Sequence, residues 1–126
     1  MKTNLEIIKK WYETLDPEIV APDVDWKLAD GFPADGHYRG RKAVFEEWLP
    51  KLLAQFENWK ATPEQLLDAG DAIVGLGYYS GRSKATSREF KVPFAHVWFM
   101  QNGRIVKVNH NANTLMLHRA ITDSVS

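Results

Sequence analysis

Hydrophobic residues recur at every second position from Asn58 to about residue 113, and this alternation constrains the fold more than any other feature. A period of two is typical of β-strands, because successive side chains of a strand point to opposite faces of a sheet. Three runs of turn-forming residues interrupt it, at Gly70-Asp71, Arg82–Ser87 and Asn102-Gly103. We therefore predict four consecutive antiparallel strands, over residues 58–69, 72–81, 88–101 and 104–113.

The first part of the chain has a helical period instead. The capping-box pair Thr3 and Glu6 predicts a helix that begins near residue 4 and ends at Asp16-Pro17. A second long helix is predicted after Gly40, with a kink at Pro50. Between them we expect a short turn over 17–20, a strand over 24–29 and a loop over 30–36. Helices that come first and strands that follow predict an α+β fold.

The parity of the last two predicted strands places two histidines on one face. Apart from His96 and His110, the even positions are apolar or aromatic: Phe90, Val92, Phe94, Trp98, Met100, Val106, Val108 and Ala112. The odd positions of the last strand, from Ile105 to Asn113, become polar and are expected to be solvated or to form a subunit contact. We expect the two long helices to cover the even face and to leave a cavity where the layers diverge.

The turn at Asn102-Gly103 sets the register of these strands. A three-residue loop would place His96 directly opposite His110, whereas a two-residue loop would make them diagonal neighbours. In both cases the two imidazoles face the same predicted cavity.

Composition excludes several classes of function. The chain has 126 residues, 16 Lys+Arg against 16 Asp+Glu, and no Cys. This length suits a single domain over 1–126, and we expect residues 116–126 to form a helical or frayed tail. Balanced charge predicts no nucleic-acid or membrane partner. Without a signal peptide or an apolar run of about 20 residues, we expect a cytoplasmic protein.

Other chemistries have less support. Two histidines without a carboxylate on the same strands do not supply the three ligands of a catalytic zinc, so no metal is predicted. Neither Ser80 nor Ser83 lies in the context of a catalytic triad. Gly75 and Gly77 lie on a strand, which indicates a bend or the close approach of another backbone. Two simpler interpretations stay open: buried histidines as core residues, and Asp30 as a turn former.

Several segments resemble the SnoaL-like, ketosteroid isomerase-related proteins of the nuclear transport factor 2-like superfamily. They are the loop Gly31–Gly40, the segment Ala69–Val74, and above all Pro93–Trp98 followed by Asn102–Val106. The resemblance spans about residues 4–115. It implies a curved mixed, mostly antiparallel sheet wrapped around three N-terminal helices, with a cone-shaped pocket. It also implies a homodimer through the outer face of the sheet.

The resemblance assigns roles to individual residues. Asp30 falls within one residue of the general base of ketosteroid isomerases. Their oxyanion-hole Asp falls near His96, and their first-helix Tyr falls on Trp11, so both oxyanion donors differ here. Compared with SnoaL-like polyketide cyclases, His96 corresponds to the catalytic His, whereas His110 and Asn113 stand where those proteins carry Asp.

We therefore predict an enzyme of the isomerase or polyketide cyclase type, which moves a proton next to a carbonyl of an apolar or cyclic ligand and needs no cofactor. Asp30 would be the base, and His96 or His110 would donate to the enolate oxygen. Burial would bring the pKa of these groups closer to neutral pH. The expected ligand contacts are Trp11, Tyr12, Phe32, Tyr38, Trp48, Leu52, Phe94, Trp98, Val108 and Asn113.

Two alternatives accompany this prediction. One is a non-catalytic ligand-binding or dimerisation module with the same pocket, which the loss of the cyclase carboxylates favours. The other is a hydratase or epoxide-opening enzyme, for which Asp30 is the only available carboxylate.

Overall fold

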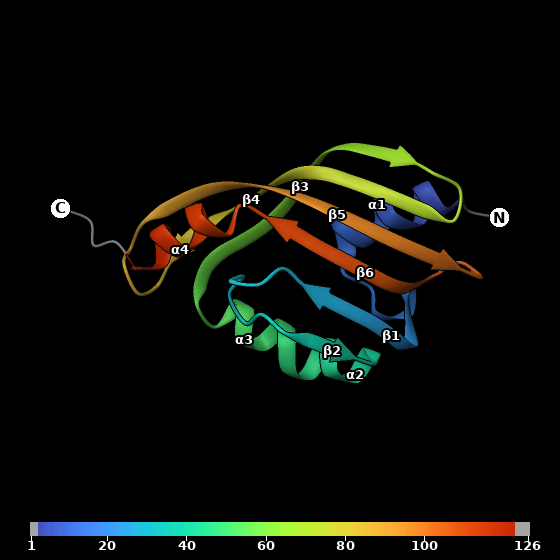
Figure 1. Cartoon of the computed structure of the whole chain (residues 1–126), viewed down its shortest axis with the longest axis horizontal. Helices are drawn as coiled ribbons and strands as arrows, with labels where there is room; N and C mark the ends of the chain where they lie inside the picture. Colours follow the sequence, from blue (N-terminus) through green and yellow to red (C-terminus); the bar gives the residue numbers. More distant parts are fainter. Residues whose placement is uncertain (1–2, 123–126) are drawn as a thin grey trace.

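Six strands form one sheet in the order β2-β1-β6-β5-β4-β3 in the computed structural model, which describes residues 3–122 (Figure 1). Strands β1 and β6 are parallel, and every other neighbouring pair is antiparallel. The predicted α+β class with a mixed, mostly antiparallel sheet is confirmed. The strands are β1 (Val20–Leu28), β2 (His37–Arg39), β3 (Phe56–Asp68), β4 (Ala72–Ser83), β5 (Glu89–Gln101) and β6 (Arg104–Ala112).

The four predicted C-terminal strands are found with ends that differ by at most two residues. The sequence missed β2, because three residues are too few to show an alternation. Strand β1 begins earlier than predicted, directly after the 3₁₀ turn η1 (Pro17–Ile19).

The helix α1 (Asn4–Thr14) begins and ends where the sequence predicts. The Thr3 hydroxyl accepts a hydrogen bond from the Glu6 N–H and donates one to the Glu6 carboxylate, both at 3.2 Å. At the other end Leu15 adopts a left-handed conformation, and its N–H donates to the Trp11 carbonyl. These caps satisfy backbone groups that a helix leaves unpaired.

The second long helix is divided into α2 (Arg41–Ala43), a π turn η2 (Val44–Trp48) and α3 (Leu49–Leu53). In the π turn the Leu49 N–H donates to the Val44 carbonyl, five residues back. Pro50 follows directly and has no N–H to continue the regular ladder. The interruption predicted at Pro50 is therefore present, in the form of a π turn.

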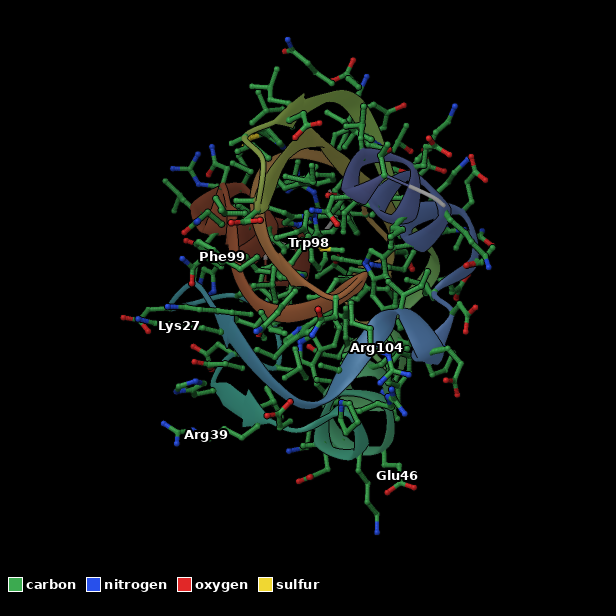
Figure 2. All side chains as sticks on the ribbon, turned by 90° about the vertical axis from the view of Figure 1, so that its right-hand side faces the viewer. Lys27, Arg39, Glu46, Trp98, Phe99 and Arg104 are labelled. Carbon is green, nitrogen blue, oxygen red and sulfur yellow. The ribbon has the colours of Figure 1, made fainter. Side chains whose placement is uncertain are left out.

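The sheet curls around the helices. Helix α1 packs against β3 and β4, whereas α2 and η2 contact β1 and β2 at the other edge (Figure 1). In Figure 2, Trp98 lies inside the curled sheet, and Lys27 and Arg39 project outward. The concave face holds the hydrophobic core, in which Trp26 and Trp98 are almost fully buried.

A bulge in β6 reconciles the two registers that the sequence left open. Gln101 pairs with Arg104 across a two-residue turn, and both turn residues have positive φ, at 53° and 75°. The register then shifts by one residue, so that His96 pairs with His110. Because of this shift, Ile105 is fully buried and Val106 is only half-buried, so their predicted facing was wrong.

On β5 the predicted parity is confirmed. Val92, Phe94, His96, Trp98 and Met100 are all buried. Gly77 also behaves as predicted, since an added Cβ would lie 2.0 Å from the Thr62 carbonyl oxygen of the neighbouring strand.

The C-terminal segment is a packed helix rather than a frayed tail. Helix α4 (Thr114–Thr122) buries Leu117 and Ala120 against the sheet, and the Thr86 hydroxyl donates to the Ala120 carbonyl. Residues 123–126 of the predicted tail lie outside the described part of the chain. None of the helices within residues 3–122 has the length and apolar character needed to cross a membrane.

Packing of α4 is testable with two leucines of the same helix. Leu117→Ala should lower the free energy of unfolding by about 2–5 kcal/mol, because it leaves a cavity in the core. Leu115→Ala is the matched control, since Leu115 is 57% exposed, and should change the stability by less than about 0.5 kcal/mol. Urea denaturation measures both; equal small effects would mean that α4 does not pack in solution.

Candidate functional site

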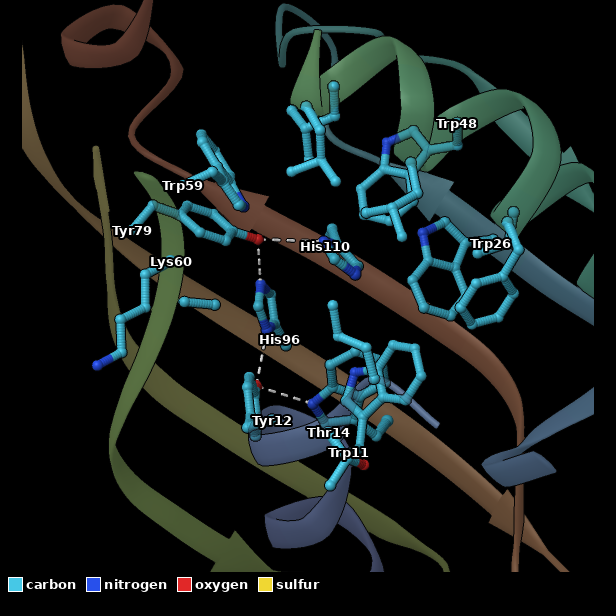
Figure 3. Close-up of a pocket in the computed structure, with 18 of the residues that line it drawn as sticks. Trp11, Tyr12, Thr14, Trp26, Trp48, Trp59, Lys60, Tyr79, His96 and His110 are labelled. Atoms are coloured by element: carbon cyan, nitrogen blue, oxygen red, sulfur yellow. Dashed lines mark hydrogen bonds between the residues drawn. The ribbon is translucent and has the colours of Figure 1, made fainter. Parts of the chain in front are cut away.

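An apolar cavity of about 300 Å³ lies between α1, the segmented helix and the concave face of the sheet (Figure 3). This volume is at the lower end of pockets that hold small molecules. Seven predicted site residues line it: Trp11, Tyr12, Trp48, Leu52, His96, Trp98 and His110. The expectation of an aromatic cavity with few polar groups therefore agrees with the structure.

The entrance to the cavity lies at the end of α1. Leu15 and Leu53 line it and are 44% and 41% exposed. Glu13 and Lys60 are exposed lining residues, and Glu13 is the only carboxylate of the lining. An apolar ligand would therefore meet exposed leucines and two charged groups at the rim before it reaches the apolar interior.

Four side chains form a continuous hydrogen-bonded chain on the cavity wall (Figure 3). The Tyr12 hydroxyl is 2.7 Å from His96 Nδ1, and His96 Nε2 is 2.5 Å from the Tyr79 hydroxyl. The Tyr79 hydroxyl is also 3.2 Å from His110 Nδ1. Trp98 anchors the first member, because its Nε1–H donates to the Tyr12 oxygen at 2.9 Å.

The backbone positions each member of the chain. Opposed pairing on β5 and β6 brings the imidazole rings of His96 and His110 to 4.2 Å between centroids. Phe94 stacks on His96 at 3.9 Å and fixes the plane of its ring. Gly75 makes room for the Tyr12 hydroxyl, since a Cβ at this position would lie 2.3 Å from that oxygen.

Hydrogen-bonding rules allow two proton arrangements of this chain. In the first, Tyr12 donates to His96 Nδ1, His96 Nε2–H donates to Tyr79, Tyr79 donates to His110 Nδ1, and His110 Nε2 carries a proton. In the second, every donor and acceptor is exchanged, so that Tyr12 holds a free O–H and His110 Nε2 is a bare acceptor. All four groups are neutral in both arrangements, and one proton is displaced from one end of the chain to the other.

Burial favours these neutral forms over charged ones. It lowers the pKa of His110 to about 3 and the pKa of His96 well below its ordinary value. It raises the pKa of Tyr12 and Tyr79 well above that of a free phenol. The charged form of each group would lose its hydration in the cavity wall. At neutral pH the site therefore holds two uncharged imidazoles and two uncharged phenols.

Asp30 does not belong to this site. Its side chain is exposed, and it is absent from the cavity lining. The position beside the histidines that a base role would require is not found, because the chain leaves β1 at Leu28 and turns at Asp30. The structure therefore gives no geometric support to Asp30 as a base beside the two histidines. The hydratase alternative depended on the same carboxylate and loses its support as well.

Five predicted ligand contacts lie outside the lining. Phe32, Phe94 and Val108 are buried behind it as core residues. The Tyr38 hydroxyl donates to the Ala34 carbonyl. Asn113 is exposed, and its side-chain oxygen accepts from the Met116 N–H as the cap of α4.

The sequence interpretation missed two residues of the candidate site, Trp26 and Tyr79, which both line the cavity. Of these, Tyr79 belongs to the hydrogen-bonded chain. It joins the two histidines, and it is 3% exposed. Parity could have found it, because Ile73, Gly75 and Tyr79 occupy the inward positions of β4, and Gly75 faces His96 in the register.

Within the described residues, no group of three or more His, Asp or Glu side chains could hold a metal ion.

Comparison with known families matches residues 11–108 to the SnoaL-like domain. The match covers most of the chain, and the protein therefore belongs to the SnoaL-like family. No curated protein matches its sequence.

Solved structures support the same fold. A nuclear transport factor 2-like protein from Burkholderia thailandensis is 29% identical with a TM-score of 0.87, over 95% of this chain and 98% of that chain. A second such protein, from Burkholderia pseudomallei, is 26% identical with a TM-score of 0.87, over 97% and 99%. A Jannaschia protein provisionally named a SnoaL-like polyketide cyclase is 12% identical with a TM-score of 0.82, over 97% and 93%, and shows the fold alone.

The space beneath Tyr12 is testable by Gly75→Ala. The added methyl group should displace the Tyr12 hydroxyl, break its bond to His96 and destabilise the protein by about 1–3 kcal/mol. Urea denaturation measures the loss, and the ¹⁵N shift of His96 Nδ1 reports the broken bond.

A double-mutant cycle supplies the control. Tyr12→Phe removes the oxygen that the new methyl group meets, so the double variant should lose less stability than the sum of the two single losses. Strict additivity would show that the hydroxyl does not lie above Gly75.

Proposed function

We propose that the protein is an acid–base enzyme of the isomerase or cyclase type, which moves a proton next to a carbonyl of an apolar ligand. The observation that carries this proposal is the chain Tyr12–His96–Tyr79–His110 on the wall of the apolar cavity. Positioned acid–base groups contribute on the order of 10²–10⁴-fold to such reactions. SnoaL-like polyketide cyclases and ketosteroid isomerase-like proteins share the fold.

The proton steps balance without a cofactor. In the first step the ligand's C–H proton passes to the Tyr12 oxygen, one proton moves along each bond of the chain, and His110 Nε2–H protonates the carbonyl oxygen. The ligand becomes an enol, and the chain is left in its second arrangement. In the return step Tyr12 protonates a carbon of the enol and His110 recovers the O–H proton. Protonation of a different carbon completes an isomerisation.

This mechanism suits the electrostatics of the cavity. A single buried histidine acting alone would become an imidazolium, which burial disfavours, as the lowered pKa of His110 indicates. Displacement of protons along the chain leaves every group uncharged before and after the step. The hydrogen-bonded chain can therefore move protons, although no carboxylate of the described residues lies in the inner part of the cavity wall.

A second candidate is a non-catalytic ligand-binding module with the same cavity. The exposed position of Asp30 favours it, since none of the carboxylates within residues 3–122 lies in the inner part of the cavity. The two candidates differ in turnover and share ligand binding, so a measurement of proton exchange separates them.

The decisive experiment follows deuterium incorporation from D₂O next to the carbonyl of α-tetralone and other apolar cyclic ketones, by NMR. The wild type should accelerate exchange, and His110→Gln should lower the rate by about 100-fold or more, because an amide cannot relay the proton. His118→Gln is the matched control, since His118 is exposed on α4. Binding of the ketones without any exchange above the His110→Gln level would favour the binding module.

The pH profile provides an independent check. The ordinary pKa of histidine is 6.5, and that of His110 is lowered to about 3, so the imidazole stays neutral in mild acid. Exchange should therefore be level from about pH 5 to pH 9. A loss of rate as the pH falls through 6.5 would identify an ordinary solvated histidine base instead.

We also propose a homodimer through the outer face of the sheet. The half-buried apolar side chains of Val74, Leu76, Val97 and Phe99 lie there on the neighbouring strands β4 and β5, where Val74 pairs with Val97. Light scattering at micromolar concentration should give a dimeric mass, and Val97→Lys should give a monomer. A monomeric wild type would contradict the proposal.

The cytoplasmic location stays a prediction of the sequence.

A further inference from the structure

Three buried nitrogen atoms of the cavity lining have no hydrogen-bond partner among the described residues. They are Nε1 of Trp26, Nε1 of Trp48 and Nε2 of His110. Their residues are 0%, 5% and 5% exposed. Buried polar atoms in folded proteins are nearly always hydrogen-bonded, so three unpaired ones in one lining require an explanation.

The three rings form a single cluster. The centroids of Trp26 and Trp48 are 5.4 Å apart, and His110 lies 5.2 Å from Trp26 and 5.5 Å from Trp48. In Figure 3 the labelled side chains of Trp26, Trp48 and His110 lie close together, away from Tyr12. The three rings that carry the unpaired nitrogens therefore cluster in one part of the lining, at the His110 end of the hydrogen-bonded chain.

The chemistry of these atoms selects the partner. An indole N–H can only donate, so Trp26 and Trp48 require an acceptor. In its first proton arrangement His110 Nε2–H is a donor as well. The one Lys or Arg side chain among the described lining residues, Lys60, is exposed, so a buried carboxylate would lack a counter-charge. A neutral oxygen can accept hydrogen bonds from these donors and needs no counter-charge.

We propose that the indole N–H groups of Trp26 and Trp48, together with His110 Nε2, bind the carbonyl oxygen of a neutral, apolar ligand. Binding of the oxygen depends on the three nitrogens alone. The reaction that follows binding rests on the proposed function. It places the ligand's oxygen at the His110 end of the chain and the carbon that exchanges its proton at the Tyr12 end. Trp26 and Trp48 are thereby positioning and oxygen-binding residues.

The test compares two probes of the same shape, α-tetralone and its oxygen-free analogue tetralin. Trp48→Phe and Trp26→Phe remove one N–H and retain an aromatic ring. Each should weaken α-tetralone binding about fivefold more than tetralin binding, the factor expected for one hydrogen bond. Trp11→Phe is the matched control, because Trp11 lines the same cavity and its nitrogen is not among the unpaired atoms. This variant should change both affinities by the same factor.

A spectroscopic readout keeps the test valid if Trp26→Phe fails to fold. The infrared carbonyl stretch of bound α-tetralone should lie below its value in an apolar solvent, and Trp48→Phe should raise it. Equal effects of Trp48→Phe on both probes with an unshifted stretch would overturn the proposal, as would failure of α-tetralone to bind. Discrimination between the probes without deuterium exchange would leave the oxygen site intact and reject the catalytic function.

Discussion

The pairing of His96 with His110 across β5 and β6 is the contact on which the candidate site depends. A shift of one residue in this register would turn one of the imidazoles to the opposite face of the sheet. The bulge beside Phe99 and Met100 prevents this shift, because it inserts one residue between a tight two-residue turn and the histidine pair. Tyr79 on the next strand then reaches both rings, so one local irregularity aligns groups from three strands.

The aromatic surroundings decide what these groups can do. Trp26, Trp98 and Phe94 exclude water from the histidines, and the resulting desolvation disfavours charge on either ring. A buried polar network in such surroundings is stable only when its members satisfy one another. The chain from Trp98 to His110 meets this condition at every internal atom and leaves a single unpaired nitrogen at its end.

Two positions of the site region hold residues that differ from those of related cyclases. The resemblance places His110 and Asn113 where related cyclases carry Asp, and the structure gives these residues different tasks. His110 becomes the last member of the neutral chain, whereas Asn113 caps α4. At these two positions the chain has no carboxylate, and its candidate site is formed from phenols, imidazoles and indoles.

The sequence by itself determined the four C-terminal strands, the first helix with its caps, the buried face of β5 and the presence of one histidine on each of β5 and β6. These features depend on local periodicity and on turn and cap residues, which a linear pattern records. Only the tertiary structure decided the bulge in β6, the separation of Asp30 from the cavity, and the roles of Tyr79 and Gly75. Each of these depends on which strands and helices meet in space, and contacts between residues distant along the chain leave no periodic signal in it.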